Sequence, residues 1–161
     1  MSQNENSGPV LDPLSIEPRT STVYPHPHDT ATQGRSKRSL TQALGLNQFG
    51  VNITELAPRS ASSLRHWHSH EDEFVYVISG RPTLVHDGGE VELAAGMTAG
   101  FPAGTENGHK LINRTDEPAV ILEVGTRSEE DEAFYPDIDM RCAPGRYRKA
   151  VFTRANGDPL P

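Results

Sequence analysis

The sequence predicts an all-β fold, either a sandwich or a barrel, formed by one domain. Short apolar and β-branched runs follow one another closely between residues 49 and 124, with glycine and proline between them. This pattern is typical of all-β proteins, and no apolar periodicity near 3.6 residues competes with it. A chain of 161 residues is long enough for one such domain with a substantial core.

The predicted strands follow these runs in order. The sequence Asp87-Gly88-Gly89 indicates a hairpin between two of them, because glycine accepts the positive φ that tight hairpin turns require. A second turn is expected at 69–72, between a run that contains two histidines and one that begins with Glu73. The predicted strands cover 49–56, 64–68, 73–78, 83–85, 91–93, 97–101, 109–112 and 120–124, with a final edge strand near 152–158.

The two flanks differ from the strand-rich centre. Residues 1–39 are predicted to form an extended arm, part of which lies across a neighbouring subunit, because five prolines interrupt any regular helix. Residues 40–127 are expected to form the barrel, and 128–161 an acidic loop and irregular tail that packs on it. The basic segment 34–38 is interpreted as a solvated loop or, alternatively, as an anion contact. The acidic segment 128–142 is interpreted as a solvated loop or, alternatively, as a lid or intersubunit contact.

Composition excludes several classes of function. A net charge of −7 argues against a nucleic-acid surface, which would need clustered lysine and arginine. The chain contains neither an apolar run long enough to span a membrane nor a recognisable signal peptide at residues 1–7. Its single cysteine, Cys142, cannot form an intrachain disulfide. We therefore expect a cytoplasmic protein without a nucleic-acid or membrane partner.

Four residues from separate segments are candidate metal ligands. His66 and His68 lie two positions apart, so on a strand they project from the same face at a spacing of about 7 Å. Glu73 begins the next predicted strand and returns to the same height if 69–72 forms the turn. His109 is the natural fourth ligand. An unpaired carboxylate in an apolar interior would cost several kcal/mol, which a divalent cation relieves.

This ligand set restricts the metal. Three neutral nitrogens and one anionic oxygen suit Fe, Mn, Co, Ni or Zn, whereas Ca prefers oxygen ligands alone. We expect one divalent transition metal, bound less tightly below about pH 6.5, because a histidine must be neutral to act as a ligand. His70 is in phase with His66 and His68 but lies in the predicted turn. It is interpreted as solvent-facing or, alternatively, as a substitute ligand or an acid/base, and the sequence identifies no catalytic residue.

The spacing of these residues resembles the two signatures of the cupin superfamily. The first is His-x-His, four residues, Glu, six residues and Gly, filled by His66, His68, Glu73 and Gly80. The second is filled by Gly96, Pro102, Gly104, His109 and Asn113, with a spacer before the histidine that is two residues longer than usual. The chain resembles a group of small single-domain bacterial cupins. This resemblance implies a single jelly-roll barrel with the four ligands inside it.

The resemblance also implies what the protein does. One expectation is a metal-dependent enzyme that acts on a small polar substrate, either by isomerisation of a sugar phosphate or by dioxygenation. The alternative is a non-catalytic module that binds or senses a small molecule. A homodimer is expected from the habit of the family and from the low hydrophobic content of 34%.

Overall fold

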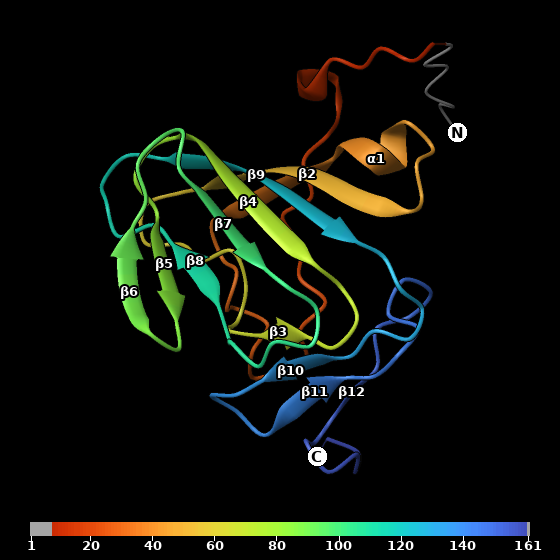
Figure 1. The fold of residues 1–161 in the computed structure, drawn as a ribbon. Coiled ribbons are helices and arrows are strands. Elements are labelled where there is room, and N and C mark those ends of the chain that lie inside the picture. Colours follow the sequence, from red (N-terminus) through yellow and green to blue (C-terminus); the bar gives the residue numbers. More distant parts are fainter. Residues whose placement is uncertain (1–7, 161) are drawn as a thin grey trace.

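The computed structural model describes residues 8–160, which form two facing layers of antiparallel strands (Figure 1). One layer is a five-stranded sheet in the order β1-β2-β9-β4-β7. The other contains a three-stranded sheet, β6-β5-β8, and a four-stranded sheet, β12-β11-β10-β3. This arrangement confirms the predicted all-β fold of the jelly-roll type, although the strands do not form one continuously hydrogen-bonded barrel.

The bounds of the elements are as follows. The five-stranded sheet contains β1 (Arg35–Ser39), β2 (Phe49–Leu56), β9 (Ala119–Thr126), β4 (Glu73–Ser79) and β7 (Thr98–Phe101). The three-stranded sheet contains β6 (Gly89–Glu92), β5 (Thr83–His86) and β8 (Lys110–Ile112). The four-stranded sheet contains β12 (Phe152–Thr153), β11 (Met140–Cys142), β10 (Ala133–Tyr135) and β3 (Trp67–His68). Within the described part of the chain, helix is limited to η1 (Pro13–Ser15) and α1 (Leu40–Ala43), and no helix there is long and apolar enough to cross a membrane.

Alternation along the strands places the core between the layers. On β4, Val75 and Val77 point inward and are buried, whereas Phe74 and Tyr76 point outward and remain partly exposed. The main cluster joins strands of both layers and consists of Leu56, Val75, Val77, Leu84, Leu93, Leu111, Ala119 and Ile121. A second cluster lies under the four-stranded sheet and consists of Ala133, Tyr135, Met140 and Cys142. Burial of the main cluster holds the layers together, and the second cluster packs the chain termini on the four-stranded sheet.

The central strands lie where the sequence predicts them, but both flanks add strands that it does not predict. Arg35–Ser39, within the expected arm, pairs with β2 as an edge strand. It has no apolar side chain to mark it, so a hydrophobic pattern cannot identify it. The expected irregular tail supplies β10 and β11, which at three residues each are too short to show periodicity. The expected final edge strand corresponds to β12. The first seven residues of the arm lie outside the described residues.

Gly80 lies in the turn after β4, at a position where a side chain would overlap with neighbouring backbone. Its φ is +80°, and an added Cβ would lie 2.6 Å from the Cα of Ala119 and 2.7 Å from the carbonyl oxygen of Pro118. Both neighbours are backbone atoms, which cannot move aside cheaply. Gly45 has a similar φ of +72° but no atom within 4 Å of an added Cβ. Both glycines share the backbone strain that a side chain would meet at positive φ, but only Gly80 adds steric overlap. Comparing the two positions therefore distinguishes these two costs.

We predict that Gly80→Ala lowers the free energy of unfolding by about 2 to 5 kcal/mol, since left-handed strain and overpacking add together. Gly45→Ala should lower it by about 1 to 2 kcal/mol, from strain alone. Chemical denaturation of both variants beside the wild type measures the difference. Equal losses for the two variants would contradict the assignment of the overlap to Gly80.

Candidate metal centre

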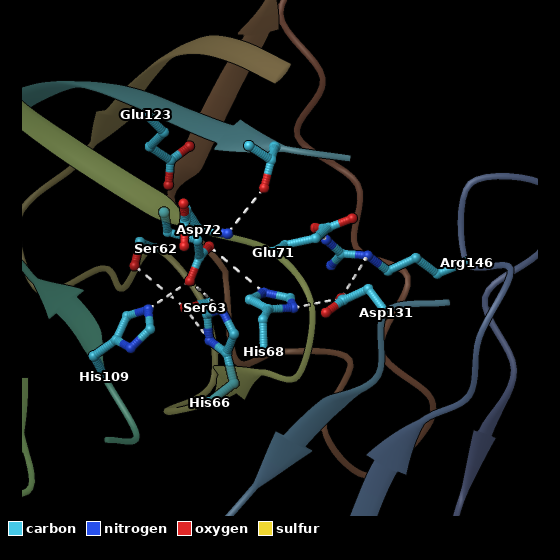
Figure 2. Close-up of polar contacts among 12 residues, drawn as sticks. Ser62, Ser63, His66, His68, Glu71, Asp72, His109, Glu123, Asp131 and Arg146 are labelled. Carbon is cyan, nitrogen blue, oxygen red and sulfur yellow. Dashed lines mark hydrogen bonds and ion pairs between the residues drawn. The ribbon is translucent and has the colours of Figure 1, made fainter. Parts of the chain in front are cut away.

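The two histidine segments are joined through their backbones. His66 and His109 form an isolated antiparallel bridge, with the N–H of each donating to the carbonyl oxygen of the other at 3.1 and 2.9 Å. Their rings are consequently close, with centroids 4.9 Å apart. His68, on β3, presents its ring on the same face, 4.9 Å from that of His66. One edge of the second layer therefore carries three neighbouring imidazoles (Figure 2).

Glu73 reaches these imidazoles from the opposite layer, because it begins β4 in the inward phase. Its carboxylate lies 2.6 Å from the Nε2 atom of His109, 3.5 Å from that of His66 and 3.6 Å from that of His68. The ligand atoms of His66, His68 and Glu73 all lie within 4.8 Å of one another. The structure thus brings together all four residues that the sequence singles out.

The Nδ1 atom of each imidazole, which lies away from Glu73, forms a hydrogen bond with an acceptor of its own. The Nδ1 atom of His66 lies 2.8 Å from the carbonyl oxygen of Leu64, and that of His109 lies 2.9 Å from the carbonyl oxygen of Asn107. A carbonyl only accepts, so Nδ1 carries a hydrogen and Nε2 is the nitrogen of each ring that faces Glu73, where a cation could take its lone pair. This is the orientation that metal-binding histidines adopt, and the four residues therefore fit a divalent cation.

His68 has a different partner, the carboxylate of Asp131. The Nδ1 atom of His68 lies 2.7 Å from the Oδ2 atom of Asp131. Asp131 is fully buried, and its Oδ1 atom accepts from the backbone N–H of His70 at 2.9 Å. The sequence analysis missed Asp131 because it is one of many acidic residues in a segment interpreted as solvated. Only the pairing of β10 with β3 identifies it, since the backbone of Ala133 lies opposite that of His68.

Charge is distributed unevenly among the four groups. Burial lowers the pKa of His66, and this effect outweighs the attraction of Glu73. Burial also opposes protonation of His68, but hydrogen bonds to Asp131 and Glu73 raise its pKa to about 9. For Glu73, burial is likewise outweighed, because the imidazoles hold the pKa of its carboxyl well below the usual range. A cation here would replace a proton on His68 and would stabilise the ionised Glu73.

A buried charge network lies behind Asp131. Arg146 contacts the carboxylate of Glu71, and its Nε atom lies 3.6 Å from that of Asp131. Tyr147 donates to Glu71 at 2.6 Å, and the backbone N–H of Ser128 donates to the same carboxylate at 2.8 Å. The acidic segment 128–142 is therefore not a solvated loop throughout. Asp131, within it, supports His68, and Arg146 compensates the charge of Asp131. His68, Glu71 and Asp131 also group closely enough to be a second candidate set of donors, but Arg146 already compensates its two acids.

Of the neighbouring side chains, His70 lies as the sequence predicts. His70 is exposed in the turn after β3, hydrogen-bonded to Ser69. Trp67 points away from the site and stacks on Phe134, with ring centroids 4.3 Å apart. Arg65 pairs at the surface with Asp137.

The four residues line one large cavity between the layers. Its volume is about 860 Å³, and it extends from the histidines across the inner face of β1, β2 and β9 to the N-terminal residues around Tyr24. Six lysine and arginine residues and four glutamates line it, although the whole protein is acidic. Hydroxyl and amide side chains, among them Ser39, Gln42 and Asn52, contribute to its wall. A cavity of this size and polarity suits a small polar molecule.

Comparison with known proteins identifies the family of this chain. The model of a cupin domain matches residues 52–125. A sugar phosphate isomerase from a cupin superfamily of Silicibacter pomeroyi DSS-3 is 48% identical over 95% of this chain and 97% of its own, with a TM-score of 0.91. A putative sugar phosphate isomerase from Acidithiobacillus ferrooxidans ATCC 23270 is 26% identical over 91% of this chain and 89% of its own, with a TM-score of 0.76.

More distant structures share the fold alone. A predicted oxalate decarboxylase from Thermotoga maritima is 20% identical over 74% of this chain and 99% of its own, with a TM-score of 0.60. None of the curated proteins compared with the sequence matches it.

The unequal environments of His66 and His68 predict different titrations in protein freed of metal by a chelator. His68 should lose its proton near pH 9, whereas His66 should do so below the ordinary value of about 6.5. Asp131→Asn should lower the pKa of His68, because the neutral amide no longer stabilises the imidazolium. Two-dimensional NMR of the imidazole nitrogens across this pH range tests both. A His68 resonance that titrates near pH 6.5 in the wild type would refute the role given to Asp131.

Proposed function

The chain belongs to the cupin superfamily, and on that basis we propose that it binds one divalent transition metal and acts on a small polar substrate in the adjoining cavity. His66, His68, Glu73 and His109 are the proposed ligands. The observation that carries this proposal is the orientation of the imidazoles, whose Nε2 atoms face one carboxylate while other groups hold their Nδ1 atoms. A bound metal would supply Lewis acidity toward the oxygens of a substrate.

Isomerisation of a sugar phosphate is the reaction that we propose. Support comes from the 48% identity to a sugar phosphate isomerase over nearly the whole of both chains. The polar wall of the cavity suits a polyhydroxylated substrate. Burial raises the pKa values of Tyr24 and Tyr135, which line the cavity, so that both hydroxyls stay protonated and can donate hydrogen bonds to substrate oxygens.

Other predictions from the sequence stay open. A non-catalytic binding module would use the same cavity and the same ligands, so turnover alone distinguishes it from an isomerase. Dioxygenation, the cytoplasmic location and the homodimer also stay predictions, the last of which sedimentation at micromolar concentration would test.

We predict about one transition metal per chain in protein purified without a chelator, as expected for one four-ligand site. Glu73→Gln and His109→Ala should each remove most of that metal, because each deletes a donor. Asp131→Asn should weaken binding by about 10- to 100-fold through its effect on His68. Elemental analysis and competition with a chromophoric chelator measure these changes.

His70→Ala is the matched control for the metal experiment. His70 lies only two residues from His68 but is exposed, so its loss should leave the metal content unchanged. Circular dichroism should show that all four variants keep their β structure. Full metal content in both Glu73→Gln and His109→Ala would show that the proposed ligands are wrong.

The metal-loaded protein is predicted to interconvert an aldose phosphate and its ketose phosphate. A panel of phosphorylated pentoses and hexoses, followed by ¹³C NMR, would reveal the activity without a coupled enzyme. Glu73→Gln should reduce the rate to that of a sample without protein, whereas His70→Ala should not change it. Saturable binding of these sugars without turnover would favour the non-catalytic alternative.

A further inference from the structure

Arg35 is a buried cation without an anionic partner. Its side chain points from β1 into the wall of the cavity, and only 7% of the residue is exposed. Among residues 8–160, no carboxylate lies within 4.0 Å of its guanidinium, in contrast to that of Arg146. An isolated buried charge is costly, so a group of this kind normally has a counter-ion.

Arg35 uses only some of its N–H donors in hydrogen bonds within the protein. One terminal nitrogen donates to the carbonyl oxygen of Ser62 at 2.8 Å, and the other donates to that of Ser21 at 3.2 Å. These bonds attach the N-terminal arm to the second layer but do not neutralise the charge. The Nε–H is buried and has no partner. Because a guanidinium has five N–H donors, three of them have no acceptor among the described residues.

The neighbouring charges do not compensate Arg35. Glu123 also lines the cavity, but Lys37 binds its carboxylate at 2.8 Å and Thr54 donates to it at 2.6 Å. Lys37 and Glu123 therefore neutralise each other. Burial lowers the pKa of Arg35, and Glu123 only partly offsets this effect. Arg19, which also lines the cavity, adds a positive charge nearby, so the wall near Arg35 carries uncompensated positive charge.

Arg35 is also connected to the histidines. The backbone of Ser62 accepts its hydrogen bond, the hydroxyls of Ser62 and Ser63 lie 3.4 Å apart, and the hydroxyl of Ser63 lies 3.3 Å from the Nδ1 atom of His66. Both Arg35 and His66 line the same cavity. One small molecule could therefore contact both.

We propose that Arg35 binds the anionic group of the substrate, a phosphate or a carboxylate, while the oxygens of its reacting end face the four-residue site. The guanidinium presents its free N–H groups as a planar fork, which matches the oxygens of either anion. This inference rests on the proposed function, because it assigns the substrate class of the same cavity. It also favours the anion-contact interpretation of the basic segment 34–38 over a solvated loop.

The experiment titrates inorganic phosphate and, separately, sodium acetate into the full chain, with calorimetry as the readout. Arg35→Gln should weaken binding of the preferred anion by about 10- to 100-fold, the usual effect of losing hydrogen bonds to a charged group. Arg38→Gln is the matched control, because it removes the same charge from the same strand at a residue that does not line the cavity. It should bind within twofold of the wild type. The anion bound more tightly identifies the group that the substrate carries.

Two further measurements keep the outcome interpretable. In the wild type, the Nε–H resonance of Arg35 should shift during the same titration, which tests the contact even if Arg35→Gln does not fold. Glu73→Gln should still bind the anion, and Arg35→Gln should keep the metal content of the wild type, so failure of the metal proposal is distinguishable from failure of this one. The inference is overturned if neither anion binds at millimolar concentration, if the Nε–H resonance does not move, or if a folded Arg35→Gln binds as tightly as the wild type.

Discussion

The carboxylate of Glu73 faces three imidazoles that belong to the other layer of the sandwich. It can do so only while β4 keeps its pairing with β7 and β9, since a slip of one residue would turn the side chain outward. The histidines depend in the same way on the bridge between His66 and His109. Packing of the two layers and assembly of the site are therefore a single structural requirement. The core cluster that includes Val75 and Leu111 stabilises both at once.

The supports around the imidazoles are not equivalent, and this difference gives the site its electrostatic character. His66 and His109 form hydrogen bonds with neutral backbone carbonyls, whereas His68 forms one with the buried carboxylate of Asp131. A carboxylate partner makes a histidine more basic and a stronger donor to a cation. Asp131 is itself held near Arg146, which Glu71 anchors. The properties of His68 thus depend, through Asp131, on Arg146 and Glu71 as well.

The sequence contains enough information to predict the central strands and the four candidate ligands, for identifiable physical reasons. Strand period and turn glycines mark β2, β4 and β9, and a His-x-His pair followed by Glu73 can converge only if a turn separates them. Arg35 and Asp131 could not be predicted in the same way. Each is a common charged residue in a polar segment, and its importance arises from burial produced by pairing between distant strands. Short strands such as β10 have too few residues for any periodic signal.

The cupin-domain match covers residues 52–125 and so contains every proposed ligand, but it excludes Arg35, Asp131 and Arg146. The side chains that tune basicity and those that could select an anion are contributed by the flanks. Two proteins with identical ligand motifs could therefore diverge in chemistry through exchange of their terminal segments alone. A change at Arg35 would touch none of the proposed ligands, whereas a change at Asp131 would reach the metal through His68.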